Sequence, residues 1–323
     1  MACLLKVVIT DHAYMDFTEE KKRFESIGAQ LIIAQCTSEE EVIQVSEDAH
    51  VLINSDLPIT RKIIEALPNL KLITRYGIGV DHIDVEAATE HGVYVTNVPD
   101  YCQIDVADHA LALILSLTQK IVHLNQKVKQ GSWDFSDGAP LHRIQTQTVG
   151  LISYGGIARI LSKKLQAIGF TVIAYDPYLE NVKASLDVEL VSLEALMQQS
   201  DVVSVHAPLV KETYHLIDRE MLALAKPHAV IVNAGRGAVI HEAHLIEALQ
   251  NGQIAAAGID VLEVEPIARN HPFLTMDQVI VTPHFAFYSE QAMEELKEKT
   301  MVNVMAMLQG EKPQYIVNPL NEK

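Results

Sequence analysis

Short runs rich in valine and isoleucine alternate with amphipathic stretches along the whole chain. In the first hundred residues these apolar runs occupy positions 5–10, 31–35, 50–54, 70–74 and 93–97. The runs are apolar almost without interruption, as expected when helices cover both faces of a parallel sheet. The pattern therefore predicts an α/β unit in the first part of the chain.

A second series of apolar runs predicts a second parallel sheet. Its members occupy positions 148–153, 171–176, 201–208, 229–235, 255–261 and 279–284. Between the two series, leucine, isoleucine and valine at helical spacing predict a single long helix over 105–130, which Gly131 is placed to end. Another helix is expected from about Ser289.

These patterns predict two doubly wound parallel-sheet domains, which agrees with a length of 323 residues. The chain is expected to cross between the domains twice, near 99–102 and near Phe287. The first domain would then comprise residues 1–101 and 288–323, and the second domain residues 102–287.

Composition and charge exclude several classes of protein. Hydrophobic residues make up 49% and charged residues 21% of the chain, the mix of an ordinary soluble globular protein. Forty-two acidic against 25 basic side chains leave a net charge of -17, which repels polyanions and anionic membranes. We therefore expect no nucleic acid and no membrane partner. The longest apolar stretch, near 111–117, is too short to span a bilayer.

The cysteines indicate neither a disulfide nor a zinc site. Cys3, Cys36 and Cys102 are an odd number without CxxC spacing, which fits a reducing cytoplasm. No metal site is predicted. The opening segment MACLLKVVIT is more typical of a first strand than of a signal peptide, so a cytoplasmic location is expected.

The run at 148–153 leads through a glycine-rich turn into a helical stretch, the context that a dinucleotide requires. There the pyrophosphate lies on free amides at the helix start, here those of Gly155, Gly156 and Ile157. The GxGxxG motif survives only in part, because Ser153 replaces the turn-forming glycine and Ala158 the last one. An ordinary tight turn is the alternative.

Asp176 ends the next apolar run, 23 residues after Ser153. A carboxylate at this place accepts hydrogen bonds from the ribose hydroxyls of NAD and repels the 2′-phosphate of NADP. Asp176 therefore favours NAD as the cofactor. The alternative is a turn residue ahead of Pro177.

Three polar residues, Arg236, Glu265 and His284, lie just beyond apolar runs of the second domain. Open α/β sheets bind ligands at this edge. Reduction of a 2-keto acid needs a cation for its carboxylate, a group that exchanges the oxygen's proton, and a partner that keeps this group protonated. Arg236 can supply the first, His284 the second and Glu265 the third. Taken singly, each could instead be structural.

Seven segments that contain these residues resemble the D-isomer-specific 2-hydroxyacid dehydrogenases, in order and over nearly the whole chain. The segments are 75–84, 98–115, 149–158, 175–178, 232–240, 258–266 and 282–292. Within the family, Arg75 and the segment TPHFAFYSEQA are most similar to the branch that includes the C-terminal binding proteins. The resemblance implies a flavodoxin-like substrate domain followed by a Rossmann NAD-binding domain.

The resemblance also implies roles for single residues of the second domain. Arg236, Glu265 and His284 fall on the positions of the catalytic set. The positions implied around the cofactor are His206, Ala234, Gly235 and, at the nicotinamide end, Asp260. A packed histidine at a strand end is the alternative for His206. Gly156 stands where a larger residue is usual in the family.

For the substrate, the resemblance implies that the amides of Ile78 and Gly79 help to hold the carboxylate. Arg75 could meet a second polar or carboxylate group, or point to solvent. Tyr101 and Phe287 could line the side-chain pocket, or pack near the domain crossover; Phe287 stands where the named branch often has tryptophan.

The expected function is that of an NAD-dependent D-2-hydroxyacid dehydrogenase working as a 2-keto acid reductase. One rival is an NAD(H)-sensing interaction protein like the C-terminal binding proteins. A second is a phosphoglycerate dehydrogenase, although the first domain offers few of the basic residues that a phosphorylated substrate needs. A third is a dehydrogenase that oxidises formate or phosphite on the same scaffold. Family members are commonly homodimers, and the apolar residues of 106–124 are expected to contribute to the interface; a spacer in a monomer is the alternative.

Overall fold

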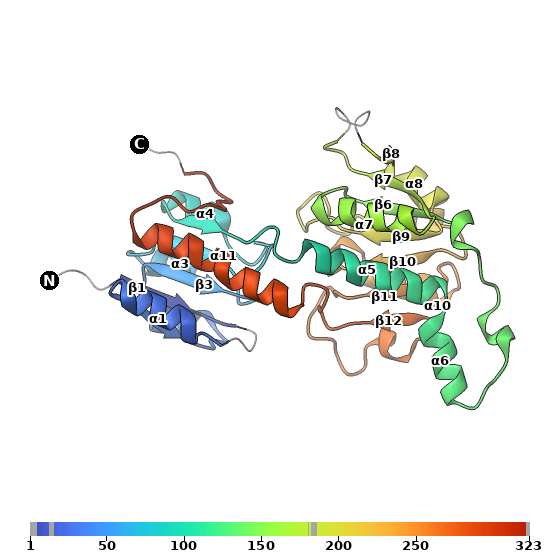
Figure 1. Cartoon of the computed structure of the whole chain (residues 1–323), viewed down its shortest axis with the longest axis horizontal. Coiled ribbons are helices and arrows are strands. Elements are labelled where there is room, and N and C mark those ends of the chain that lie inside the picture. Colours follow the sequence, from blue (N-terminus) through green and yellow to red (C-terminus); the bar gives the residue numbers. More distant parts are fainter. Residues whose placement is uncertain (1–4, 13–15, 180, 182–185, 321–323) are drawn as a thin grey trace. The chain divides into compact units, whose positions relative to one another are not determined.

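The structure is a computed structural model that describes residues 5–12, 16–179, 181 and 186–320. The chain divides into two compact units, each with its own sheet (Figure 1). Unit 1 is Met1–Tyr101 with Glu290–Lys323, and unit 2 is Cys102–Ser289. The sequence placed the return to the first domain two residues earlier, at residue 288.

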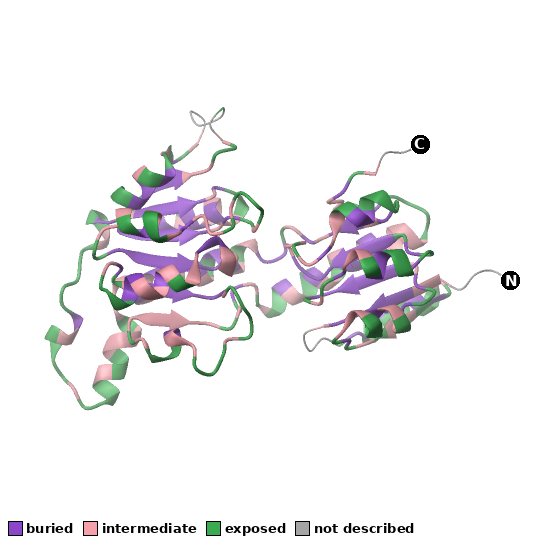
Figure 2. Cartoon of the chain, turned by 180° about the vertical axis from the view of Figure 1, so that it is seen from behind, coloured by how far each residue is buried: buried purple, intermediate pink, exposed green. Residues whose placement is uncertain are grey.

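Unit 1 contains a five-stranded parallel sheet in the order β2-β1-β3-β4-β5, which is the flavodoxin-like order. The strands are β1 (Leu5–Ile9), β2 (Ala29–Ile33), β3 (Val51–Asn54), β4 (Leu72–Arg75) and β5 (Tyr94–Thr96). The helices are α1 (Thr18–Ser26), α2 (Glu39–Val45), α3 (Arg61–Ala66), α4 (Val85–Glu90) and α11 (Glu290–Leu308). β3 and β4 are buried at every position (Figure 2), which explains the apolar residues that begin both strands and places the polar Asn54, Thr74 and Arg75 at their buried carboxyl ends.

The end of the chain pairs with the sheet of unit 1. Val317 N donates to Val95 O at 2.8 Å, and Asn318 Oδ1 accepts a hydrogen bond from Val95 N at 2.6 Å. Asn318 Nδ2 donates in turn to Val93 O at 2.9 Å. These bonds cover the backbone of β5, an edge strand that would otherwise expose unpaired groups.

Unit 2 contains a seven-stranded parallel sheet in the order β12-β11-β10-β9-β6-β7-β8. This is the Rossmann order with β12 added at one edge. The strands are β6 (Thr148–Ile152), β7 (Thr171–Tyr175), β8 (Glu189–Leu190), β9 (Val202–Val205), β10 (Val230–Asn233), β11 (Ala256–Ile259) and β12 (Val279–Val281). The sequence pattern missed β8, which has only two residues.

The helices of unit 2 connect these strands. They are α5 (Gln103–Thr118), α6 (Ile121–Lys129), α7 (Gly156–Ala167), α8 (Leu193–Gln199), α9 (Arg219–Leu224) and α10 (Glu242–Gln250). Short 3-10 turns are η1 (Phe135–Gly138), η2 (Ile144–Thr146), η4 (Gly237–Val239) and η5 (Pro272–Thr275). The side chains of Ser192 and Asp218 cap the starts of α8 and α9 by accepting backbone hydrogen bonds.

The prediction of one long helix over 105–130 is wrong. The helix ends at Thr118, and Lys120 adopts a left-handed backbone with φ 52 before α6 begins. The Thr118 hydroxyl donates to Ile114 O at 2.7 Å, a local bond that competes with helical continuation. Gly131, with φ 97, ends α6 as expected.

The part of the expected dimer stripe that lies on α5 is buried within unit 2, whereas Ile121 of α6 is exposed. Val106, Leu113 and Leu117 of α5 are at most 8% exposed, and α5 packs against β10, β11 and α7. Exposed apolar side chains occur at Ile104, at the start of α5, and further along the chain at Ile121 and Val128 of α6, Trp133 and Phe135. Amphipathic spacing identified the buried face of α5 correctly but assigned it to the wrong partner.

No helix in the described ranges combines the length and apolarity needed to cross a membrane. Cys36 and Cys102 are free and buried, whereas Cys3 lies outside the described residues.

Candidate active site

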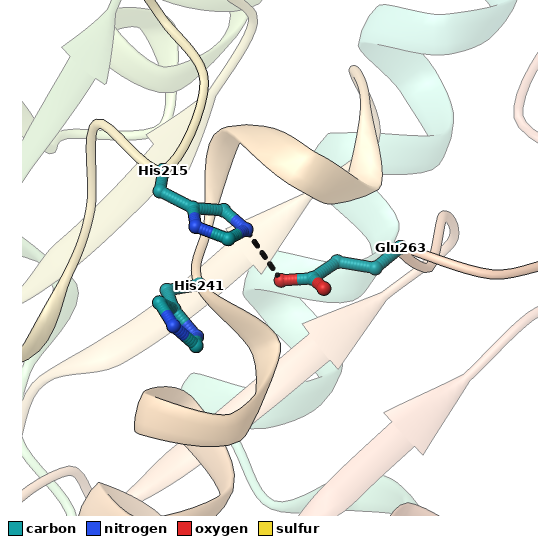
Figure 3. A group of neighbouring side chains, drawn as sticks. All are labelled: His215, His241 and Glu263. Atoms are coloured by element: carbon teal, nitrogen blue, oxygen red, sulfur yellow. Dashed lines mark ion pairs between the residues drawn. The ribbon is translucent and has the colours of Figure 1, made fainter.

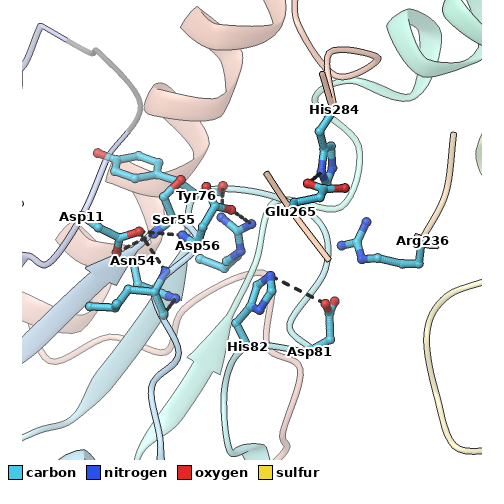
Figure 4. A network of polar contacts seen from close by, with 12 residues as sticks. Asp11, Asn54, Ser55, Asp56, Tyr76, Asp81, His82, Arg236, Glu265 and His284 are labelled. Carbon is cyan, nitrogen blue, oxygen red and sulfur yellow. Dashed lines mark hydrogen bonds and ion pairs between the residues drawn. The ribbon is translucent and has the colours of Figure 1, made fainter. Parts of the chain in front are cut away.

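His284 and Glu265 form a hydrogen-bonded pair in unit 2 (Figure 4). His284 follows β12 and Glu265 lies in the segment after β11, so adjacent parallel strands deliver both residues to one edge of the sheet. The Nδ1 of His284 is 2.8 Å from Oε2 of Glu265. The other carboxylate oxygen of Glu265 accepts a hydrogen bond from Leu262 N at 2.9 Å, which fixes the carboxylate toward the ring.

The pair shifts the ionisation of both members toward the charged forms. The hydrogen bond to Glu265 raises the pKa of His284, against the opposing effects of burial and of the positive charge of Arg236. Burial raises the pKa of Glu265, but the bonds from His284 and Leu262 N and the charge of Arg236 outweigh it, so that this pKa is lowered. Nδ1 of His284 therefore donates to a carboxylate, which leaves Nε2 to exchange a proton.

Asp260 fixes the turn that carries His284. His284 has a left-handed backbone, with φ 52, and its amide donates to Asp260 O at 2.8 Å. The Asp260 side chain is fully buried and accepts hydrogen bonds from Phe285 N at 2.8 Å and Ala286 N at 3.0 Å. The role expected for Asp260 at the nicotinamide end stays a prediction.

His109 is a residue of this site that the sequence did not reveal. It belongs to α5, and its Nε2 forms a 3.0 Å hydrogen bond with Thr282 Oγ1 and lies 3.5 Å from Asp260 Oδ1. The Thr282 hydroxyl also donates to Asp260 Oδ1 at 2.5 Å. His109 lies in a segment that resembles the family, but nothing in its spacing distinguishes it from a helix-surface histidine.

Arg236 lies in the turn that follows β10, and its guanidinium is turned toward the Glu265–His284 pair (Figure 4). Asn233 shapes the turn: its Nδ2 donates to Arg236 O at 3.0 Å, and its Oδ1 accepts from Gly235 N at 3.1 Å. Gly237 permits close packing, since an added Cβ would lie 1.9 Å from Leu262 O. The structure thus brings the three predicted catalytic residues to one place.

The glycine-rich turn leaves the start of α7 open. Ser153 has φ 71, the left-handed conformation that the missing first glycine would adopt without strain. Gly155 is the N-cap of α7, and no atom lies within 4 Å of the position where its Cβ would be. At Gly156 an added Cβ would meet the Gln103 side chain at 2.4 Å, which explains the absence of a larger residue. A pyrophosphate therefore fits at the Gly155, Gly156 and Ile157 amides.

Asp176 follows β7 and lies beside this turn. Its Oδ2 accepts hydrogen bonds from Tyr154 N at 2.9 Å and from Ser153 Oγ at 3.4 Å, and its Oδ1 accepts from Tyr178 N at 3.0 Å. The carboxylate is half-buried and is oriented by backbone amides. It can therefore receive the ribose hydroxyls of a dinucleotide without rearrangement of the turn.

The other residues expected around the cofactor lie at the carboxyl ends of β9 and β10. His206 Nε2 is 2.9 Å from Ser204 Oγ, and burial lowers the pKa of His206 to about 4, so the ring is neutral at pH 7. Ala234 is buried, and an added Cβ on Gly235 would lie 3.5 Å from His206 Cα. His206, Ala234 and Gly235 thus lie side by side where the strands β9 and β10 end. Their contacts with the cofactor stay predictions.

In unit 1, the residues expected to bind substrate follow β4. Ile78 O accepts a hydrogen bond from Asn97 Nδ2 at 2.7 Å, which holds the turn that also contains Gly79. Arg75 is only 8% exposed, so the alternative of a solvent-facing arginine is wrong. Its Nη2 donates to Asp56 Oδ1 at 3.1 Å and its Nη1 to Tyr76 O at 2.5 Å.

Asp11 organises the segment that holds Arg75 (Figure 4). The carboxylate of Asp11 accepts hydrogen bonds from the amides of Ser55, Asp56 and Leu57 at 3.1, 2.6 and 2.9 Å. This network fixes the Asp56 backbone beside the guanidinium of Arg75, and sequence reasoning did not identify it.

The two aromatic residues expected at the substrate pocket lie in different units. Tyr101 is buried in unit 1. Phe287 is half-buried in unit 2, and its ring meets the His284 ring edge-on with centroids 6.2 Å apart. Phe287 therefore contacts the imidazole of the pair, whereas the role of Tyr101 toward a substrate stays a prediction.

Unit 2 has the strand order of a dinucleotide-binding domain, and comparison with known proteins identifies the family. The family model described as "D-isomer specific 2-hydroxyacid dehydrogenase, NAD binding domain" matches residues 111–286. The chain therefore belongs to the D-isomer-specific 2-hydroxyacid dehydrogenase family. This confirms the family that the sequence predicted. Two further predictions are also confirmed, namely two parallel-sheet domains and a nicotinamide dinucleotide cofactor, NAD(P).

Two relatives and one solved structure illustrate the similarity. A D-3-phosphoglycerate dehydrogenase of Methanocaldococcus jannaschii is 37% identical over 98% of this chain, which spans only 60% of that protein. A glyoxylate reductase of Thermofilum pendens is 37% identical over 80% of this chain and 78% of its own length. A D-lactate dehydrogenase from Aquifex aeolicus, complexed with NAD and lactic acid, has a TM-score of 0.84 and 28% identity over 94% of this chain and 96% of its own.

Proposed function

We propose that the chain is an NAD-dependent D-2-hydroxyacid dehydrogenase that reduces a small 2-keto acid. The observation that carries the proposal is the Glu265–His284 pair, with a raised pKa at His284 and the guanidinium of Arg236 turned toward it. This arrangement lies on the same sheet as the dinucleotide turn. A bound nicotinamide supplies the hydride in reduction and accepts it in oxidation.

The side chains then have separate tasks. Arg236 binds the substrate carboxylate through its planar fork. His284 donates the proton on Nε2 to the carbonyl oxygen as the carbonyl carbon gains hydride, and takes it back in the reverse reaction. Glu265 keeps the imidazole protonated and oriented. Asp260 and Asn233 hold the turns that carry His284 and Arg236.

The surroundings of Arg75 favour a substrate with a single anionic group. Its guanidinium is buried and already donates to Asp56 and Tyr76 O. A phosphorylated acid would need additional cations, whereas the chain as a whole carries a net charge of -17. The glyoxylate reductase among the relatives agrees with a small substrate, and the phosphoglycerate dehydrogenase keeps the phosphorylated acid as the second candidate.

NAD is proposed as the cofactor in preference to NADP because of Asp176. Its half-buried carboxylate, held by two backbone amides, would repel a 2′-phosphate.

A homodimer is proposed from the apolar side chains exposed on unit 2. Trp133 is 91%, Phe135 94% and Ile121 58% exposed, and large apolar side chains so fully exposed within 15 residues of sequence are uncommon on a monomer. Sedimentation velocity of wild type and of a Trp133→Ser, Phe135→Ser double variant tests this. We expect a dimer for wild type and a monomer for the variant; a wild-type monomer would contradict the assignment.

The function itself is tested by following NADH consumption with glyoxylate, hydroxypyruvate, pyruvate and 3-phosphohydroxypyruvate. We expect turnover of at least one of the unphosphorylated acids by wild type and none above background by His284→Ala. Tight NADH binding without turnover of any acid would instead support the NAD(H)-sensing rival. Preference for 3-phosphohydroxypyruvate would support phosphoglycerate dehydrogenase activity.

A further inference from the structure

Three metal-ligating side chains of unit 2 lie together outside the site described above (Figure 3). One ligand atom each of His215, His241 and Glu263 lies within 4.8 Å of the other two. We propose that these residues bind a divalent cation that prefers imidazole ligands, of which Zn²⁺ is the representative. The three positions are 26 and 22 residues apart in sequence, so no motif marks them.

Backbone hydrogen bonds hold the three segments together. His215 N donates to Ala238 O at 2.8 Å, and His241 N donates to Ile217 O at 2.9 Å. Glu263 is tied to the same region because its Oε1 accepts from Glu242 N at 2.7 Å. The backbone therefore holds the three segments together before any cation binds, which lowers the entropic cost of binding.

The imidazole rings also stack on neighbouring rings. The rings of Tyr214 and His215 stack with centroids 3.9 Å apart, and those of His241 and His244 with centroids 3.6 Å apart. The rings of His215 and His241 lie 4.2 Å apart. At this separation, and with 31° between the ring planes, the two imidazoles lie nearly face to face, so one of them turns about its side-chain bonds when both bind the same cation.

Two ring nitrogens in this cluster are shielded from solvent without a hydrogen-bond partner among the described residues. They are His215 Nε2 and His241 Nδ1. His215 Nε2 lies 3.0 Å from Glu263 Oε1, but this contact does not have hydrogen-bond geometry. Leaving buried polar nitrogens unsatisfied costs free energy. A cation bound between His215 Nε2 and Glu263, with His241 as the third ligand, would satisfy the buried nitrogen of His215.

The ligand set selects the kind of cation. Two imidazoles and one carboxylate are typical ligands of Zn²⁺ and of similar transition-metal ions. Mg²⁺ and Ca²⁺ prefer oxygen ligands and are not expected to bind here. Three protein ligands leave a fourth position for water. A bound ion would tie the segments after β9 and β11 to the start of α10, and so stabilise the folded state.

Calorimetric titration of full-length, metal-free protein without a histidine tag tests the proposal, with ZnCl₂ as the probe and MgCl₂ for comparison. We expect one Zn²⁺ per chain and no response to Mg²⁺. His241→Ala should weaken binding by more than about 100-fold, since loss of even an outer partner of a metal ligand costs about 10- to 100-fold. Glu263→Gln should also weaken it while keeping an oxygen acceptor for Glu242 N.

His228→Ala is the matched control. Its Nε2 lies 2.8 Å from Asp201 Oδ1. Lys226 Nζ lies 2.8 Å from the same oxygen, so the ammonium group of Lys226 already occupies the place where a metal ion would bind. This variant should bind Zn²⁺ like wild type. Zn²⁺ should also raise the melting temperature of wild type and of His228→Ala but not of His241→Ala. Absence of binding to wild type, or equal affinity in His241→Ala, would overturn the proposal.

Discussion

Two histidine–glutamate pairs in unit 2 have similar separations but differ in hydrogen-bond geometry and in neighbours. Nδ1 of His284 lies 2.8 Å from Oε2 of Glu265, and Nε2 of His215 lies 3.0 Å from Oε1 of Glu263. Glu263 precedes Glu265 by two residues. Both histidines have left-handed backbones, with φ 52 and 53. A left-handed residue that is not glycine is disfavoured by about 1–2 kcal/mol, so surrounding bonds must hold both.

The neighbours separate the two pairs chemically. His284 and Glu265 share a hydrogen bond that raises the pKa of the imidazole, and the positively charged neighbour of this pair is Arg236. At His215 the contact lacks hydrogen-bond geometry, and the neighbour is a second imidazole, that of His241. In the two proposals, the third group beside the pair differs: a guanidinium accompanies proton exchange at His284, and a second imidazole accompanies cation binding at His215.

The largest expected effect separates the two histidines by activity. His284→Ala should lower kcat for keto acid reduction by about 10²- to 10⁴-fold, the usual contribution of a general acid. His215→Ala should retain kcat within about tenfold, because His215 transfers no proton in the proposed reaction. Steady-state assays with NADH measure both variants. Equal losses would show that the two pairs are not functionally distinct.

A smaller effect on kinetics is expected at Asp176. Unlike Glu265 and Glu263, this carboxylate has no imidazole partner among the described residues, and its partners include backbone amides. Asp176→Ser removes the charge that favours NADH. The ratio of kcat/KM for NADPH to that for NADH should rise by about 10- to 100-fold, since hydrogen bonds to charged groups contribute about 1.5–3 kcal/mol. An unchanged ratio in parallel assays with both cofactors would remove Asp176 from cofactor selection.

The smallest effect concerns Ser153, which has the same left-handed backbone as the two histidines, with φ 71. Ser153→Gly should relieve strain and raise the free energy of unfolding by about 1 kcal/mol. Urea denaturation of both proteins measures this difference. A less stable variant would indicate that the 3.4 Å bond from Ser153 Oγ to Asp176 outweighs the strain.

Much of the fold could be predicted because apolar runs in buried parallel strands are nearly continuous. The break at Lys120 could not, since residues on both sides keep helical spacing while the backbone of one residue turns left-handed. The two-residue strand β8 is too short for any pattern.

Some residues of the site could also be predicted from the sequence, and others could not. Arg236, Glu265 and His284 could be found because each follows a strand, and strand ends meet at one edge of a parallel sheet. His109 and the cluster around His215 could not, because their contacts depend on how a helix and loops far apart in the sequence pack together.

The pH dependence of kcat/KM for keto acid reduction tests the central claim most directly, in wild type and in the Glu265→Gln and Glu263→Gln variants. His284 must be protonated, so wild-type activity should be level at low pH and fall as pH rises through the raised pKa of His284. Glu265→Gln removes the charge that raises this pKa, so its fall should move to lower pH, whereas Glu263→Gln should keep the wild-type profile. The same midpoint in all three proteins would contradict the assignment of Glu265 and His284 as the working pair.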